Sequence, residues 1–141
     1  KYPPNDSEKR YVFRYGHFLG YLEPVDGANY VVDVSRAVLR VLPGLFQDGL
    51  ILDSADFVSR LAEKLPLLDR GTYQNQIRDQ VRNGQPLSLE ENTFSRALSL
   101  ALERLRLSSR IALEPQADDP NAFSLRVAEQ RRLVSRVELL N

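Results

Sequence analysis

The 141-residue chain contains no cysteine, no methionine and no tryptophan, and its only histidine is His17. The absence of cysteine excludes disulfides, thiolate chemistry and cysteine-based metal sites. A single histidine also excludes any site that needs two. We therefore expect no metal and no other cofactor. Because methionine is missing even at position 1, we expect the chain to be a segment of a longer protein.

An excess of charge is also missing, since 19 basic residues balance 19 acidic ones. No global field therefore steers the chain toward nucleic acid or membrane, and such binding would need a local patch. No apolar run approaches the roughly 20 residues needed to cross a bilayer, and nothing resembles a signal peptide. These absences predict a soluble, cytoplasmic protein with no membrane partner.

What is present is an ordinary globular composition, with 43% hydrophobic and 27% charged residues. The length suits one domain, which we place at residues 11–141 after a polar, proline-containing linker at 1–10. Tyr11, Phe13, Tyr15 and His17 alternate with other residues, which favours a strand, and a short helix is the alternative. The aromatic side chains of this region, Tyr11, Phe13, Tyr15, Phe18 and Tyr21, could stack on bases, but we favour their filling the core.

Three short helical patterns follow between residues 33 and 86. Asp33 is expected to cap the first, which should stop at Pro43 and Gly44. Asp53 is expected to cap the second, with Asp56 in a box-like arrangement. The apolar positions of these two patterns are Val34, Ala37, Val38, Val41 and Leu42, and then Phe57, Val58, Leu61, Ala62 and Leu65, before Pro66. The third pattern spans residues 72–83 and ends at a possible cap, Asn83-Gly84.

The clearest helix is expected at residues 89–108, because Ser88-Leu89-Glu90-Glu91 matches a capping box. Its broad apolar face comprises Phe94, Ala97, Leu98, Ala101, Leu102 and Leu105. The opposite side, expected to face solvent, comprises Arg96, Ser99, Glu103, Arg106 and Arg110.

Beyond this helix the pattern changes to alternation at residues 111–113 and 123–127, with a turn-rich segment between them. We predict a β-hairpin whose tip is residues 116–121. Residues 129–141 suit either a strand or a helix, and we slightly favour a helix or an extended tail. The expected fold class is therefore mainly α with a small antiparallel β-hairpin, an α+β fold.

Three helices, the last bearing arginines and followed directly by a hairpin, resemble the winged-helix variant of helix-turn-helix domains over residues 33–127, with the 72–83 helix inserted. The resemblance implies that residues 89–108 form the recognition helix. It places a set of candidate nucleic-acid-binding residues on this helix and just after it: Asn92, Thr93, Arg96, Ser99, Arg106 and Arg110. Arginine can pair with guanine or phosphate, and asparagine with adenine.

The acidic residues of this region oppose DNA binding. Asp118 and Asp119 occupy the expected wing tip, and Glu90 and Glu91 occupy the start of the helix, where phosphates would approach. A basic surface would nevertheless arise if three further arginines, Arg131, Arg132 and Arg136, joined Arg96, Arg106 and Arg110 on one face.

Two functions are therefore open. The first is a non-catalytic module of a larger bacterial regulatory or DNA-processing protein that binds double-stranded DNA. The second is a protein–protein or homodimerisation module with an exposed apolar patch, for which the candidates are Phe46, Leu50, Ile51, Leu139 and Leu140. No enzyme and no small-molecule substrate are expected, because His17 has no evident catalytic partners and no phosphate-binding loop occurs.

Overall fold

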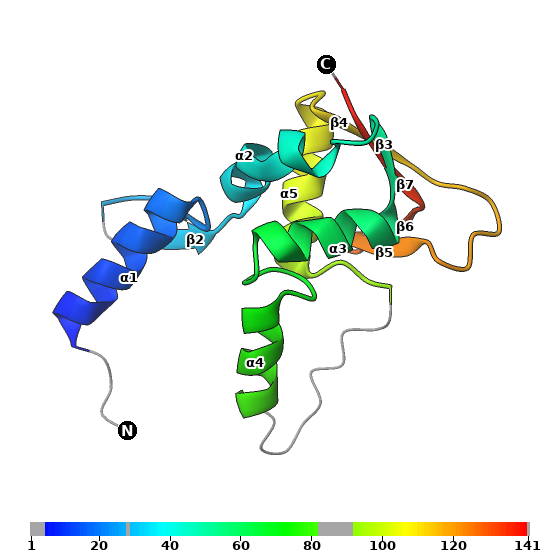
Figure 1. The fold of residues 1–141 in the computed structure, drawn as a ribbon. Helices are drawn as coiled ribbons and strands as arrows, with labels where there is room; N and C mark the ends of the chain where they lie inside the picture. Colours follow the sequence, from blue (N-terminus) through cyan, green and yellow to red (C-terminus); the bar gives the residue numbers. More distant parts are fainter. Residues whose placement is uncertain (1–4, 28, 82–91, 141) are drawn as a thin grey trace.

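The computed structural model describes residues 5–27, 29–81 and 92–140. These residues form an α+β fold of helices with small antiparallel sheets, which confirms the expected class and is compatible with a winged-helix-like one (Figure 1). The helices are α1 (Asp6–Leu19), α2 (Ser35–Leu45), α3 (Ser54–Lys64), α4 (Thr72–Val81) and α5 (Arg96–Leu107). The strands are β1 (Leu22–Pro24), β2 (Tyr30–Val32), β3 (Ile51–Asp53), β4 (Ile111–Glu114), β5 (Phe123–Val127), β6 (Gln130–Val134) and β7 (Arg136–Leu139). In this described part no helix is both long and apolar enough to span a bilayer.

The core lies between α2, α3 and α5. Their apolar faces bury Val38, Leu42, Phe57, Leu61 and Leu102 almost completely, as the helical spacing predicted. Full burial of such side chains contributes about 1.5–3 kcal/mol each. The core therefore fixes α5 firmly to the other two helices.

Asp53 was correctly expected to be the N-cap residue of α3, but the N-cap residue of α2 is Val34 and not the expected Asp33. Asp33 Oδ1 accepts hydrogen bonds from the Ser35 backbone N–H at 3.0 Å and the Ser35 hydroxyl at 2.6 Å. Asp53 is the N-cap residue of α3, although its side chain makes no capping bond. The expected stop at Pro43 is wrong, since α2 continues to Leu45. A proline in the last turn removes only one helical hydrogen bond, so the helix tolerates it.

A three-stranded sheet has the order β3-β7-β4, with both pairs antiparallel. Leu52, Ile111 and Val137 lie on its buried side. The Ser54 hydroxyl donates to the Val134 carbonyl at 2.7 Å and ties the start of α3 to this sheet. The strand between α2 and α3 thus lies beside the strands that follow α5.

The expected hairpin between residues 111–113 and 123–127 is wrong in its pairing. Both segments are strands, but β4 pairs with β7 and β5 pairs with β6. A two-residue turn at Ala128 and Glu129, with Ala128 at φ 54°, closes the β5–β6 hairpin. Such turns match the twist of the strands they connect, whereas the longer segment after β4 does not impose pairing. The slight preference for a helix or tail at 129–141 is therefore also wrong.

The expected strand at residues 11–17 is wrong as well, because α1 covers this segment and begins inside the expected linker. Asn5 Oδ1 accepts from the Glu8 N–H at 2.9 Å, and the Glu8 carboxylate accepts from the Asn5 N–H at 2.8 Å. This capping box stabilises a helix regardless of the alternation that follows. The helix ends at Gly20, whose φ is 85°.

α5 is shorter than expected at its N-terminus. It begins at Arg96, and the Ser95 hydroxyl accepts from the Leu98 N–H at 3.2 Å. Asn92 has a φ of 59°, and Thr93 forms a bridge with Ser124 of β5, so neither is helical. The predicted capping box at 88–91 and the predicted cap at 83–84 lie outside the described residues. The start of α4 at Thr72 is as expected.

Candidate nucleic-acid interface

The N-terminus of α5 is held in place by a buried carboxylate. Asp69, which is 4% exposed, accepts a hydrogen bond from the Ser95 N–H through Oδ2. Burial raises the pKa of Asp69, and the hydrogen bonds from Ser95 only partly offset this effect. Phe94 and Phe123 lie next to each other in the adjoining core, with ring centroids 5.0 Å apart. The start of β5, at Phe123, is thereby anchored to the start of α5.

The first strand of the β5–β6 hairpin packs against α5. The Arg126 backbone N–H donates to the Ser99 hydroxyl at 3.2 Å, and Arg132 donates to Glu103 at 3.1 Å. Ser99 is fully buried by this contact. The hairpin therefore covers the middle of the helix face that was expected to be free.

Glu103 brings two arginines together. Its carboxylate accepts from Arg106 Nε at 3.0 Å and from another nitrogen of the same guanidinium at 2.6 Å, in addition to the bond from Arg132. The Arg106 hydrogen bond is the main reason that the pKa of Glu103 is lowered, and the nearby charge of Arg132 adds to it. One carboxylate thus fixes two guanidinium groups from different elements.

The outer face of the hairpin carries two more arginines. Arg126 and Arg131 lie directly opposite each other in the β5–β6 register, so their side chains share one face. Arg131 Nε also donates to the Ser124 hydroxyl at 2.6 Å. α5 and the hairpin together carry six arginines against two glutamates, although the whole chain has no net charge. This helix–hairpin surface is the local basic patch that nucleic-acid binding would require. Arg104 is not part of this surface, because it pairs with Asp33 at the start of α2.

The acidic residues of the expected wing tip lie elsewhere. Asp118 and Asp119 line a shallow cavity of about 340 Å³ with Asp53 and Asp56 at the start of α3. Ser135 also lines this cavity, and it directly follows Val134, the last residue of β6, at the opposite end of the hairpin from the Ala128 turn. The carboxylates therefore sit at the base of the hairpin, whereas Arg126 and Arg131 are next to its turn.

The structure brings only some of the predicted site residues together. Arg96 is exposed at the first position of α5, and Arg106 lies on the same face. Asn92 lies outside the helix, and its side chain accepts a hydrogen bond from Arg70 at 3.2 Å. Thr93 is also outside the helix, and Ser99 is buried. Arg110 lies past the other end of α5, next to β4.

Of the three additional arginines, Arg132 joins Arg106 and Arg131 lies on the neighbouring hairpin face. Arg136 does not join them, because it pairs with Asp53 at 3.4 Å. Arg126 was not predicted from the sequence. Its partnership with Arg131 depends on the register of β5 against β6, and only the Ala128-Glu129 turn could have indicated that register.

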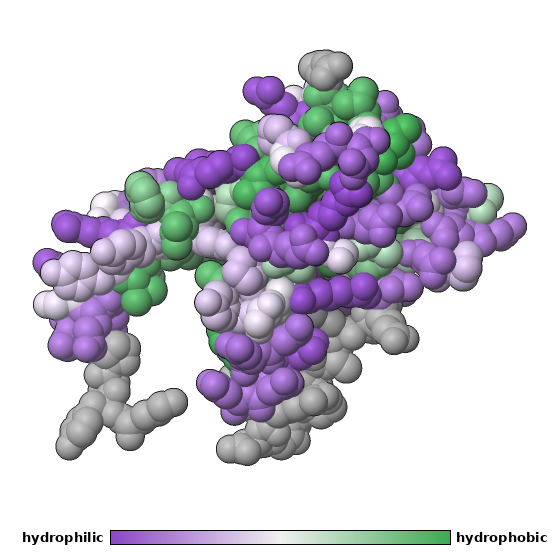
Figure 2. Space-filling model, in the orientation of Figure 1, coloured by the Kyte–Doolittle hydropathy of each residue, from purple (hydrophilic) through white to green (hydrophobic). Residues whose placement is uncertain are grey.

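A second surface arises from residues that were expected to fill the core. The side chains of Tyr11, Tyr15 and Phe18 project from α1 and are mostly exposed. α1, β1 and β2 form an arm that stands away from α3 and α5 (Figure 1). In Figure 2, apolar atoms in green reach the surface of this arm on the left of the view. The expectation that the aromatics of this region fill the core is therefore wrong for Tyr11, Phe13, Tyr15 and Phe18, whereas Tyr21 is partly buried and packs against the core.

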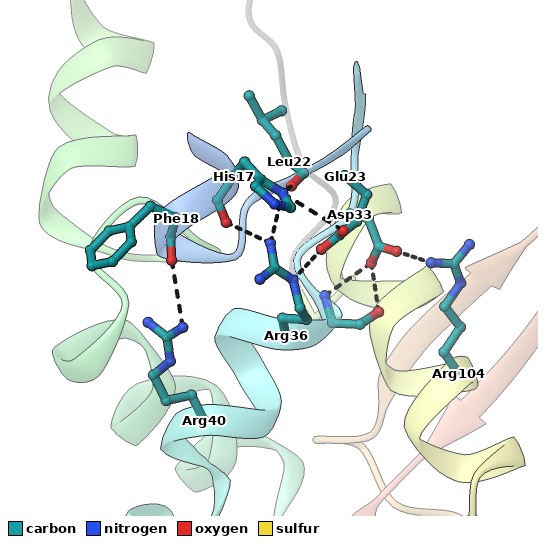
Figure 3. Close-up of polar contacts among 9 residues, drawn as sticks. His17, Phe18, Leu22, Glu23, Asp33, Arg36, Arg40 and Arg104 are labelled. Atoms are coloured by element: carbon teal, nitrogen blue, oxygen red, sulfur yellow. Dashed lines mark hydrogen bonds and ion pairs between the residues drawn. The ribbon is translucent and has the colours of Figure 1, made fainter. Parts of the chain in front are cut away.

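Polar contacts join the arm to the body (Figure 3). Arg36 of α2 pairs with Glu23 of β1 and donates to the His17 carbonyl at 2.5 Å. Arg40 donates to the Phe18 carbonyl at 3.5 Å. Asp33, at the start of α2, pairs with Arg104 of α5. Within the described residues, no cluster of three or more potential metal ligands occurs.

The fold and this surface define a small α+β domain with a basic helix–hairpin face and an aromatic arm. A family model described as DpdG-like matches residues 3–119, and the chain therefore belongs to the DpdG-like family. The matched range includes the arm, all five helices and β4, and it ends before β5. No curated protein and no solved structure matches the chain.

Proposed function

We propose that this chain is a non-catalytic, winged-helix-like module that associates with double-stranded DNA through the helix–hairpin surface, as part of a larger bacterial regulatory or DNA-processing protein. The order of the elements supports the winged-helix assignment. Three core helices, with α4 inserted before the last one, are followed by antiparallel strands. The resemblance implied that residues 111–127 form a hairpin directly after the last helix, whereas β4 pairs with β7 and the hairpin is formed by β5 and β6.

The observation that supports DNA association is the concentration of arginines on α5 and the β5–β6 hairpin. Neutralising phosphates with arginines releases counterions from the duplex, and this effect dominates sequence-independent affinity. Ser99 is buried and the hairpin occupies the middle of the helix face, so this face is poorly suited to enter a groove. We therefore expect contacts mainly to phosphates, with weak discrimination between sequences.

The test is fluorescence anisotropy of a labelled duplex titrated with the chain at several salt concentrations. We expect affinity to fall steeply with salt, and Arg96→Glu or Arg131→Glu to weaken binding at least about tenfold and lower the salt slope by about 1. Arg14→Glu is the matched control, because Arg14 lies on the arm and undergoes the same charge change. Unchanged affinity in both surface variants, or an equal loss in the control, would contradict the proposal.

The second candidate is a protein-binding module built on the same fold. Most of the expected apolar patch is accessible, since Leu50, Ile51 and Leu140 are exposed and Leu139 is half-buried. Phe46 is an exception, because it is 6% exposed and belongs to the core. The larger apolar surface is on the arm, and it is the observation that favours this candidate. The kind of partner that would fit the arm can be inferred from its chemistry.

A further inference from the structure

α1 exposes its apolar face instead of burying it. Five residues form this apolar stripe, with exposed fractions of 62% for Tyr11, 64% for Val12, 65% for Tyr15, 71% for Phe18 and 44% for Leu19. Tyr11, Tyr15 and Phe18 follow the i, i+4, i+7 spacing that aligns side chains on one helix face. No residue of α1 is buried. Such a contiguous apolar surface indicates a binding site.

The stripe cannot be covered by turning α1 toward its own hairpin, because the opposite face of the helix is already in contact there. The Phe13 ring stacks on Tyr30 of β2, with ring centroids 5.1 Å apart and an angle of 8° between the rings. His17 Nδ1 lies 3.1 Å from the Leu22 carbonyl oxygen. In Figure 3 the Phe18 ring points away from the polar contacts that join the arm to α2. The stripe therefore faces outward in the folded chain.

Two arginines border the stripe. Arg14 lies three residues after Tyr11 and four before Phe18, so it neighbours both on the helix surface, and Arg10 lies one turn earlier. In the described residues neither the Arg10 nor the Arg14 guanidinium forms a hydrogen bond or ion pair. Like charges at i and i+4 destabilise a helix. Carboxylates from a partner would relieve this repulsion and could bind each guanidinium through two hydrogen bonds.

We propose that the apolar stripe of α1 docks an amphipathic helix of a partner protein whose apolar face is bordered by carboxylates. Helices bind one another through i, i+4, i+7 anchors of this kind, and exposed aromatic residues often dominate the energy of an interface. The proposal develops the second candidate function. It does not depend on duplex binding, since the arm and the helix–hairpin surface are separate.

The composition of the stripe favours a helix over single-stranded nucleic acid. Val12 and Leu19 offer no aromatic face for a base to stack on.

The basic border also disfavours a second copy of the chain as the occupant. In an antiparallel pair of α1 helices, the twofold axis places both borders on the same side of the interface. The two Arg14 residues would then face each other without an intervening carboxylate. An acidic border on the partner removes this conflict.

The experiment uses the whole chain and two labelled helical peptides with the same leucine stripe. One peptide has glutamates along the border of the stripe, and the other has lysines at the same positions. We expect the glutamate peptide to bind and the lysine peptide to bind at least about tenfold more weakly. Phe18→Ala should reduce binding of the glutamate peptide at least about tenfold, because truncation of an anchor residue costs this much.

Arg14→Glu should weaken the glutamate peptide and strengthen the lysine peptide, which a general loss of folding could not produce. Arg96→Glu is the control and should leave both peptides unaffected. Circular dichroism checks that Phe18→Ala remains folded. Binding of neither peptide, or equal binding of both, would overturn the proposal.

Two further outcomes would also overturn it. One is a dimer in sedimentation velocity that Phe18→Ala dissociates, and the other is a poly-thymidine oligonucleotide that competes with the glutamate peptide. Loss of peptide binding with intact duplex binding would refute only this inference, and the reverse result would refute only the DNA proposal.

Discussion

At Asp69 the chain buries a carboxylate to hold the start of α5. Oδ2 accepts the Ser95 N–H, whereas Oδ1 is buried and has no hydrogen-bond partner among the described residues. An ionised carboxylate with an unsatisfied oxygen is costly to bury. The raised pKa of Asp69 is the consequence, and Glu103 shows the opposite direction because arginines donate to its carboxylate.

The shift at Asp69 predicts a pH dependence of stability. A raised pKa means that the folded state binds the proton on Asp69 more tightly than the unfolded state does. The stability gained from this proton is complete below the unfolded pKa of about 3.9, and it is lost as the pH rises through the folded pKa. The free energy of unfolding of the wild type, relative to Asp69→Asn, should therefore decrease as the pH is raised from about 4. Urea unfolding of both proteins at each pH measures it. A difference that stays constant as the pH is raised would show that Asp69 has no raised pKa.

Gly20 fixes the angle at which the arm leaves the body. Its φ of 85° disfavours other residues, and an added Cβ would lie 2.8 Å from the Ala37 backbone nitrogen. Gly20→Ala should destabilise the junction by at least about 1–2 kcal/mol. Thermal unfolding and the far-ultraviolet circular dichroism signal measure the effect.

Gly44→Ala in α2 is the matched control for this substitution. A Cβ there would meet no heavy atom within 4 Å. Alanine should therefore stabilise the helix by up to about 1 kcal/mol. If both variants changed stability in the same direction, the junction would not depend on the conformation of Gly20.

At the scale of the elements, local chemistry predicted the core helices, and it did not predict how the strands pair. The spacing of Val38, Leu42, Phe57 and Leu61 indicated the core helices because burial imposes a period of 3.6 residues. The partner of β4 depends on which strand reaches it across the fold, so local alternation could not identify β7. α1 shows the reverse case, since its aromatic alternation competed with a capping box at Asn5 and Glu8.

The candidate site reflects the same distinction. Arg96 and Arg106 were predicted because helix periodicity places them on one face. Ser99 shares that face, but its exposure could not be predicted, since it depends on the hairpin that folds over α5. The contact between Arg132 and Glu103 joins residues 29 positions apart. A tertiary contact of this kind leaves no periodic signal in the sequence.

At the scale of the whole molecule, the chain separates two kinds of surface. The body presents arginines on α5 and the β5–β6 hairpin, and the arm presents apolar side chains on α1. The junction between them is mainly polar, involving Arg36, Arg40 and the backbone around His17. A neutral net charge therefore conceals a basic surface and an apolar one that suit different partners.

This division predicts that the arm opens independently of the body. α1 buries no side chain, whereas α5 buries Leu98, Leu102 and Leu105 in the core. Segments with few buried apolar contacts open at a lower free energy than the core. In native-state hydrogen exchange, amides in the middle of α1 should therefore exchange with an opening free energy at least about 2 kcal/mol below that of amides in α5. Equal protection of the two helices would mean that the arm and the body unfold as one cooperative unit, and that the apolar stripe is displayed on a rigid element.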